Sequence, residues 1–269
     1  GRIVRAVLAG EVRDLAPLAA LSDLRALVCY APRARQAPRA GPLPAVFGDL
    51  SPLRRLALEE LSVSGSRVKD LSPLIGLPLV RLDVSDTQVA DLSPLKRLPL
   101  AELSLAGLPA VRDLHGLIGL PLETLDISRT SVADLTPLSV LKLKRLRAGG
   151  TRIRDIKALA GLPLRELDLS RTEVYDLSPL RGMTLSALNL SGTRLRDLGA
   201  VAAMKVRNLD VSGTDIRDLA ALRGQPLERL NLQATRVSDL SPLQGVPLRW
   251  LDISGTEVAD LRPLQQLPL

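Results

Sequence analysis

The sequence predicts an α/β solenoid, a right-handed curved stack with a parallel β-sheet on its concave face and short 3₁₀ or helical turns on its convex face. Twelve aspartates recur along the chain, and from Asp49 onward they are 21 residues apart, except for one step of 22 between Asp91 and Asp113. Each aspartate precedes a leucine or isoleucine, often within Asp-Leu-Ser-Pro-Leu, and follows a leucine-rich segment. A repeat this short and regular is typical of stacked repeat architectures.

The first half of each repeat predicts a short strand. In residues 79–99, which read LVRLDVSDTQVADLSPLKRLP, apolar and polar residues alternate ahead of a threonine. Alternation with a period of two is typical of a strand with one buried face. The one cysteine of the chain, Cys29, occupies a buried position of such a strand, so we expect it to be a small core residue.

The second half of each repeat predicts a short helical turn that begins at the aspartate. A short polar side chain binds free backbone N–H groups at a helix start, and proline is tolerated at the first helical position. Too few residues then remain for more than a turn of 3₁₀-like structure. A column of carboxylates also suggests calcium, but one acidic group per repeat, followed by an apolar residue, offers too few ligands. We therefore expect these aspartates to be structural and expect no metal site.

These residues and their spacing resemble the leucine-rich repeat family, and the Asp-Leu-Ser-Pro-Leu segment is most similar to the bacterial internalin type. The resemblance covers essentially all of residues 1–269 and implies a single solenoid of about twelve repeats. Where the family usually has asparagine or cysteine, this chain has a hydroxyl, which can also bind the backbone of the turn. These ladder residues are Ser66, Thr87, Thr130, Thr151, Thr172, Thr193, Thr214, Thr235 and Thr256.

The resemblance implies a non-catalytic protein-recognition module whose partner binds the concave sheet and adjacent loops. Two columns of polar strand residues face that side, and parallel stacking places equivalent residues about 4.8 Å apart. Like charges avoid each other in both columns, which cross-strand pairing, a duplication of two repeats or a mixed-charge binding groove would each explain. The expected partner-binding residues are Arg81, Asp83, Asp126, Arg145, Arg147, Glu166, Asp168, Asn189, Asn208, Asp210, Arg229, Asn231, Trp250 and Asp252.

Trp250 is the only tryptophan in a chain whose aromatic content is 1%. Its position in the repeat predicts that it projects from the concave sheet. Exposed tryptophans are favoured as binding anchors. Because the residue lies in the last complete strand, packing at the end of the solenoid and incidental exposure are the alternatives.

The net charge of +7 leaves open a second function, binding of nucleic acid or another acidic polymer. The repeat places one set of arginines along the edge beyond the threonine ladder, although no aromatic residues interleave with them for base stacking. A loop insertion at 31–44, rich in proline and arginine, contributes Arg33, Arg35 and Arg39 as further candidates. The edge arginines are Arg67, Arg112, Arg152, Arg154, Arg194, Arg196, Arg217 and Arg236.

The sequence offers no catalytic or cofactor-binding motif. His115 is the only histidine, so neither a zinc site nor a Ser-His-Asp site in a recess is expected. A phosphate-binding glycine loop with its lysine is also missing. We therefore expect no enzyme activity and no cofactor.

No apolar run is long enough to span a membrane and no secretory signal is recognisable, so we expect a cytoplasmic protein without a membrane span. Repeat proteins need polar caps, and neither end of this chain has a recognisable capping unit. We therefore expect a section of a larger protein, in which further domains or a partner cover the ends. A structural spacer or adhesive solenoid is the third functional class.

Overall fold

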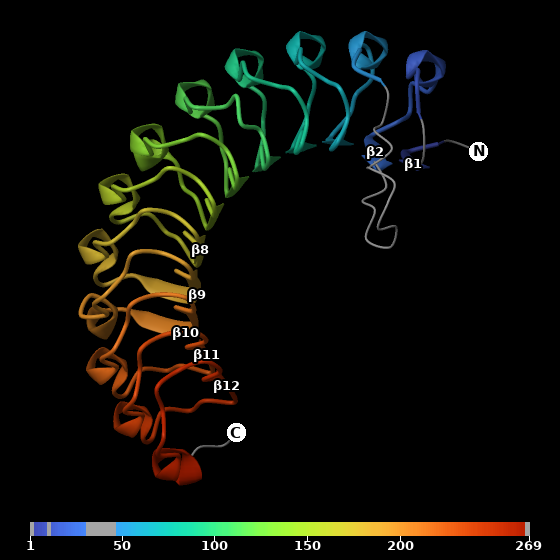
Figure 1. Cartoon of the computed structure of the whole chain (residues 1–269). Coiled ribbons are helices and arrows are strands. Elements are labelled where there is room, and N and C mark those ends of the chain that lie inside the picture. Colours follow the sequence, from blue (N-terminus) through green and yellow to red (C-terminus); the bar gives the residue numbers. More distant parts are fainter. Residues whose placement is uncertain (1–2, 10–11, 31–46, 267–269) are drawn as a thin grey trace. The chain divides into compact units, whose positions relative to one another are not determined.

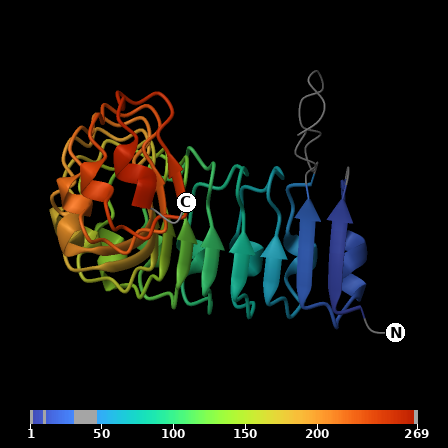
Figure 2. The ribbon, with the colours of Figure 1, turned by 90° about the horizontal axis from the view of Figure 1, so that it is seen from below.

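A computed structural model describes residues 3–9, 12–30 and 47–266 of the chain. The chain divides into two compact units, Gly1–Val132 (unit 1) and Ala133–Leu269 (unit 2). In each unit the strands lie on the concave side and the 3₁₀ helices on the convex side (Figure 1). Figure 2 shows the strands of unit 1 side by side and pointing the same way.

Each repeat contributes one strand, and successive strands pair in parallel within each unit. The strands of unit 1 are β1 (Arg5–Ala9), β2 (Ala26–Tyr30), β3 (Glu60–Ser62), β4 (Arg81–Asp83), β5 (Glu102–Ser104) and β6 (Thr124–Asp126). The strands of unit 2 are β7 (Arg145–Arg147), β8 (Glu166–Asp168), β9 (Thr184–Asn189), β10 (Lys205–Asp210), β11 (Arg229–Asn231) and β12 (Trp250–Asp252).

The convex segments are all short 3₁₀ helices, as the sequence predicts. Those of unit 1 are η1 (Ala16–Ala20), η2 (Ser51–Leu53), η3 (Ser72–Leu74), η4 (Ser93–Leu95) and η5 (His115–Leu117). Those of unit 2 are η6 (Thr136–Val140), η7 (Lys157–Leu159), η8 (Ser178–Leu180), η9 (Val201–Ala203), η10 (Ala220–Leu222), η11 (Ser241–Leu243) and η12 (Arg262–Gln266).

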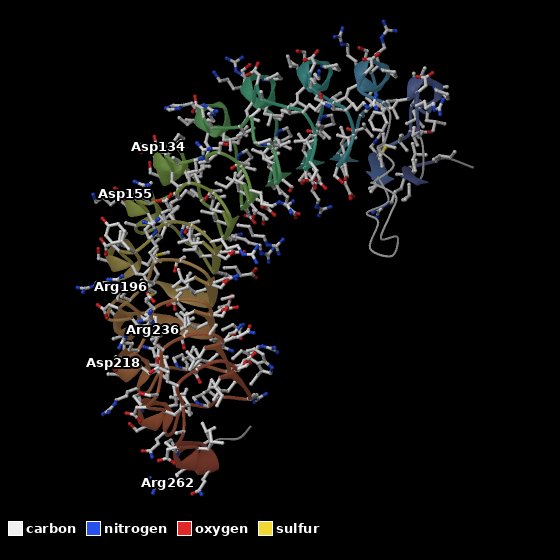
Figure 3. All side chains as sticks on the ribbon, viewed as in Figure 1. Asp134, Asp155, Arg196, Asp218, Arg236 and Arg262 are labelled. Atoms are coloured by element: carbon white, nitrogen blue, oxygen red, sulfur yellow. The ribbon has the colours of Figure 1, made fainter. Side chains whose placement is uncertain are left out.

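The twelve aspartates that recur along the sequence, called the register aspartates below, all make the same contact. In eleven repeats the contact is at the first residue of a 3₁₀ helix, and for Asp197 it is in the turn just before η9. Oδ1 of each accepts a hydrogen bond of 2.7–3.0 Å from the backbone N–H two residues later. In η8, the N–H and hydroxyl of Ser178 both donate to Asp176, and these bonds hold the pKa of Asp176 below its ordinary value. Asp134, Asp155 and Asp218 lie on the convex side in Figure 3. The expected structural role of these aspartates is confirmed.

The threonine ladder closes the turn after β4 and after each strand from β6 to β12. Eight threonine hydroxyls donate to the carbonyl oxygen three residues earlier, at 2.6–2.8 Å. Ser66 occupies the same position in unit 1, but its buried Oγ has no hydrogen-bond partner among the described residues. Stacked leucine, valine and isoleucine side chains fill the core, and Cys29 is buried with them, as expected. Burial raises the pKa of the Cys29 thiol to about 11.

Strands β9 and β10 are six residues long, whereas the other strands of unit 2 have three. In the neighbouring repeats a proline stands ahead of the strand, for example Pro163 and Pro226, and proline cannot donate to a sheet ladder. Thr184 and Lys205 replace this proline in β9 and β10, and they pair with each other in the register. Two adjacent repeats without the proline therefore allow the sheet to widen.

Candidate functional site: the concave face of unit 2

The structure places all fourteen expected concave-face residues on strands, three in unit 1 and the others in unit 2. Arg81 and Asp83 lie on β4 and Asp126 on β6. The three loop candidates lie outside the described residues. They are Arg33, Arg35 and Arg39. The residues in unit 2 are Arg145 and Arg147 on β7, Glu166 and Asp168 on β8, Asn189 on β9, Asn208 and Asp210 on β10, Arg229 and Asn231 on β11, and Trp250 and Asp252 on β12.

Opposite charges pair across adjacent strands in one column of the concave face, called the first column below. This column comprises Glu60, Arg81, Glu102, Thr124, Arg145, Glu166, Ala187, Asn208, Arg229 and Trp250. Nε and Nη2 of Arg145 donate to the two carboxylate oxygens of Glu166, at 2.6 and 3.0 Å. These bonds hold the pKa of the Glu166 carboxyl below its ordinary value. In unit 1, Nε of Arg81 lies 3.2 Å from Oε1 of Glu102. The alternation of charge thus has the structural explanation that cross-strand pairing offers.

The other column of the concave face, called the second column below, has a structural role that was not predicted. This column comprises Ser62, Asp83, Ser104, Asp126, Arg147, Asp168, Asn189, Asp210, Asn231 and Asp252. Side-chain oxygens of Asp83, Asp126, Asp168, Asn189, Asp210, Asn231 and Asp252 accept hydrogen bonds of 2.8–3.0 Å from the backbone N–H two residues later. These bonds fix the turn at the end of each strand, as the register aspartates do on the convex side. The signal was an aspartate or asparagine two residues before a serine or glutamine, a spacing at which such side chains commonly bind the backbone.

A hollow of about 300 Å³ opens on the concave face of unit 2. Ala187 lines its middle, where the same column elsewhere holds longer residues such as Arg145, Glu166 and Arg229. The hollow, called the concave hollow below, brings together ten of the expected residues. They are Arg145, Arg147, Glu166, Asp168, Asn189, Asn208, Asp210, Arg229, Asn231 and Trp250.

Trp250 lies on the wall of the concave hollow, and 38% of it is exposed. The guanidinium carbon of Arg229, on the adjacent strand, is 4.8 Å from the centre of the Trp250 ring. A cation over the face of an indole is attractive, and it orients both side chains. Sequence reasoning found Trp250 but missed Ala187, whose short side chain was the signal for a hollow at this point of the column.

The arginines beyond the threonine ladder are partly balanced by carboxylates. One ring does lie among them, contrary to expectation: Tyr175 is 69% exposed and lines a hollow with Arg196 and Arg236, two residues labelled in Figure 3. Because acidic side chains already bind several of the guanidinium groups, this edge is less cationic than its arginines alone suggest. The ion pairs, with N–O distances of 2.6–4.0 Å, are Arg154–Glu173, Arg194–Glu173, Arg196–Asp215 and Arg236–Asp215.

Three further features of the described residues bear on function, namely His115, the residue types that hold metal ions, and the helices. His115 is exposed at the start of η5, where its ring Nδ1 is 2.5 Å from Asp113 Oδ1. The described histidine, cysteine, aspartate and glutamate residues form no group of three or more that could hold a metal ion. None of the described helices has the length and apolar character that a membrane crossing requires.

Comparisons with known proteins give matches among solved structures only, because neither a family model nor a curated protein matches the chain. An internalin of Listeria monocytogenes, InlF, superposes with a TM-score of 0.74 at 24% identity, over 99% of this chain and 85% of that one. Internalin C2 of the same organism gives a TM-score of 0.52 at 27% identity, over 78% of this chain and 82% of that one.

A third solved structure shares the same architecture. It is the functional domain of InlJ from Listeria monocytogenes, with a TM-score of 0.63 at 17% identity, over 98% of this chain and 57% of that one. Parallel strands in sequence order, short 3₁₀ helices and these neighbours agree with one another. The chain therefore has the leucine-rich repeat fold that its sequence predicts, and its structural neighbours include internalins.

Proposed function

We propose that the chain is a non-catalytic protein-recognition module and that an exposed segment of a partner protein binds in the concave hollow of unit 2. The observation that carries this proposal is the position of Ala187, a short residue that lines a recess of about 300 Å³ together with the longer side chains of Arg145, Glu166, Arg229 and Trp250. Recesses lined by a few fixed polar groups and an aromatic ring are typical binding sites. The leucine-rich repeat fold supports the proposal only by analogy.

The walls of the concave hollow are ordered by contacts within the chain. Arg145 is bound by both oxygens of Glu166, and Nδ2 of Asn231 donates to Oδ2 of Asp210 at 3.1 Å. Side chains that are already held in place lose little conformational entropy when a partner binds, which favours affinity. The side chains of Arg145, Glu166, Asp210 and Asn231 suit a polar segment of the partner that inserts one side chain. Trp250 offers the aromatic contact that often anchors such interfaces.

Four expected residues lie outside the concave hollow, namely Arg81, Asp83, Asp126 and Asp252. We infer that they extend the binding surface and do not anchor it. Arg81 and Asp83 are engaged in hydrogen bonds within unit 1, to Glu102 and to the backbone of Ser85. Their truncation should therefore affect binding less than a change in the concave hollow.

The test fills the concave hollow without disturbing the fold. Ala187→Arg places a long side chain at a position where this column already carries Arg81, Arg145 and Arg229. Thr124→Arg adds the same charge to the same column in unit 1 and is the matched control. Proteins retained by the immobilised chain are compared by mass spectrometry for both variants and for Trp250→Ala.

We expect one partner to be retained by the wild type and by Thr124→Arg, and lost from Ala187→Arg and Trp250→Ala. A partner that survives Ala187→Arg but is lost when residues 31–44 are deleted would move the site to the loop. If no protein distinguishes the variants, the solenoid acts as a spacer and the proposal is wrong.

A further inference from the structure

A second hollow, of about 570 Å³, lies at the edge of the sheet in unit 2 where the chain enters the strands. Its apolar floor consists of the buried side chains of Leu162, Leu164, Met183 and Leu185, together with the exposed Pro163 and Pro226. It is called the edge hollow here. Its lining differs from that of the concave hollow, with which it shares no residue.

The edge hollow exists because β9 carries short outward side chains. Thr184 and Ser186 line it, while the flanking strands present Arg165 on one side and Lys205 and Arg207 on the other. Ser186 is also drawn down to the backbone, since its hydroxyl donates to the carbonyl of Arg165 at 2.9 Å. Short residues between long ones leave a recess above the apolar floor, between cationic walls.

The cationic walls continue into the neighbouring repeats of unit 2. Backbone hydrogen bonds place equivalent residues of successive strands next to each other, for example Arg165 N–H to Lys144 O at 2.7 Å and Arg249 N–H to Glu228 O at 2.9 Å. The equivalent residues at this edge of unit 2 are Lys144, Arg165, Ser186, Arg207, Glu228 and Arg249. Glu228 is the one acidic residue among them, and it pairs with Arg207 at an N–O distance of 3.2 Å. The exposed cations of this basic edge are Lys142, Lys144, Arg165, Lys205, Arg207 and Arg249.

We propose that the edge hollow and the basic edge bind an acidic polypeptide segment that inserts an apolar side chain between Arg165 and Lys205. The charge of the edge selects for carboxylates, and the apolar floor gives a reason for a hydrophobic anchor. No aromatic side chain lines the edge hollow, so it lacks the stacking platform that single-stranded nucleic acid uses. This surface is separate from the concave hollow and does not depend on the function proposed for it.

The test uses the full chain and synthetic probes. A fluorescein-labelled peptide of mixed glutamate and leucine is titrated by fluorescence anisotropy, beside a glutamate and serine peptide of equal charge and a labelled oligothymidine. The double variant Arg165→Glu with Lys205→Glu reverses the walls of the edge hollow. The matched control, Arg152→Glu with Arg217→Glu, makes the same change of charge on the exposed edge beyond the threonine ladder.

We expect the glutamate and leucine peptide to bind, and its affinity to fall by about tenfold or more in the Arg165 and Lys205 variant. The control variant and Ala187→Arg should bind it as the wild type does. Four results would overturn the proposal. They are equal losses in both double variants, equal binding of the glutamate and serine peptide, tighter binding of the oligothymidine, and failure of the glutamate and leucine peptide to bind at all. Circular dichroism of each variant shows that the fold is intact.

Discussion

The column of residues at the edge of the sheet, where the chain enters the strands, differs in charge between the two units. In unit 2 it is cationic apart from Ser186 and Glu228, whereas in unit 1 it mixes apolar residues with charges of both signs. The unit 1 residues are Val4, Arg25, Glu59, Val80, Ala101 and Glu123, and the unit 2 residues are Lys144, Arg165, Ser186, Arg207, Glu228 and Arg249. Backbone pairing is nevertheless the same, because the N–H groups of Ala101 and Arg165 both donate to the preceding strand at the equivalent carbonyl.

The two units thus share one structural frame, which consists of the buried leucines, the register aspartates and the ladder threonines. They differ in their outward-facing side chains, which are called the display below. Buried leucines, register aspartates and ladder threonines recur in both, since each of them satisfies packing or a backbone hydrogen bond. Outward positions contribute little to stability and are free to diverge. The short side chains of β9 in unit 2, Thr184, Ser186 and Ala187, line two hollows. The two units therefore differ in side-chain length and charge on one strand and its neighbours, and the proposed binding specificity rests on that difference.

The largest expected effect tests whether the frame is equally strong in both units. Leu188 on β9 and Leu103 on β5 hold the same buried position, with 1% and 2% exposure. Substitution of either by alanine should lower the free energy of unfolding by about 2–5 kcal/mol, because it removes buried methyl groups and leaves a cavity. Urea unfolding is followed by circular dichroism for the whole chain and by fluorescence of Trp250 for unit 2.

Leu188→Ala should move the fluorescence transition to lower urea more than Leu103→Ala does, because each repeat contacts only its neighbours. Coincident transitions by both probes in both variants would mean that the chain unfolds as one cooperative body. The division into two units would then have no thermodynamic meaning.

A smaller effect is expected at the threonine ladder, where unit 1 has an exception. Ser66→Thr should raise the free energy of unfolding by about 0.5–1.5 kcal/mol, because the methyl group restricts the rotamer and directs the hydroxyl to a carbonyl. In unit 2, Thr172 donates to Leu169 O at 2.6 Å and is 4% exposed, so Thr172→Ser should be destabilising, by about 0.8 kcal/mol for the buried methyl. Calorimetry measures both. A loss of stability in Ser66→Thr would show that the ladder site in unit 1 has no room for the methyl group.

Sequence reasoning predicted the frame well and the display incompletely. The aspartate period and the alternation of leucines predicted strands, turns and core, since these positions have one physical role in every repeat. The early starts of β9 and β10, at Thr184 and Lys205, were not predicted. Such an extension needs two adjacent repeats without the proline, and the sequence of one repeat does not reveal that relation. That residues 1–269 form a single solenoid stays a prediction.

The candidate site shows the same limit. Trp250 is easily singled out because it is the only tryptophan. Ala187 is not, because alanine is common in the chain and a hollow depends on the neighbours of a short residue. The sequence predicts ligand-facing charges for the aspartates of the concave column, yet Asp168 and Asp210 each accept a hydrogen bond from a backbone N–H at one carboxylate oxygen. Cross-strand pairing was one of three explanations that the sequence left open for the first column, and the structure shows it where adjacent strands bring Arg145 to Glu166.

The smallest effect concerns acid and should not distinguish the units. Hydrogen bonds to their carboxylates lower the pKa of register aspartates in both, for example Asp70 in unit 1 and Asp239 in unit 2, and that of Asp260 to about 2. An unfolded aspartate has a pKa of about 3.9. The unfolded chain therefore binds more protons in the interval below that value, and stability that is present above it is lost as the pH falls through the folded pKa values.

Two triple variants separate charge from hydrogen bonding in this acid response. Asparagine keeps the acceptor oxygen, as Asn189 and Asn231 do at 3.0 Å in the concave column, but it does not titrate. Melting temperatures between neutral pH and the acid limb should therefore change less with pH in each triple variant than in the wild type, and by a similar amount in both units. A flatter response in one unit alone would show that the frame, and not only the display, differs between them. The substituted residues are Asp49, Asp70 and Asp91 in unit 1, and Asp155, Asp176 and Asp239 in unit 2.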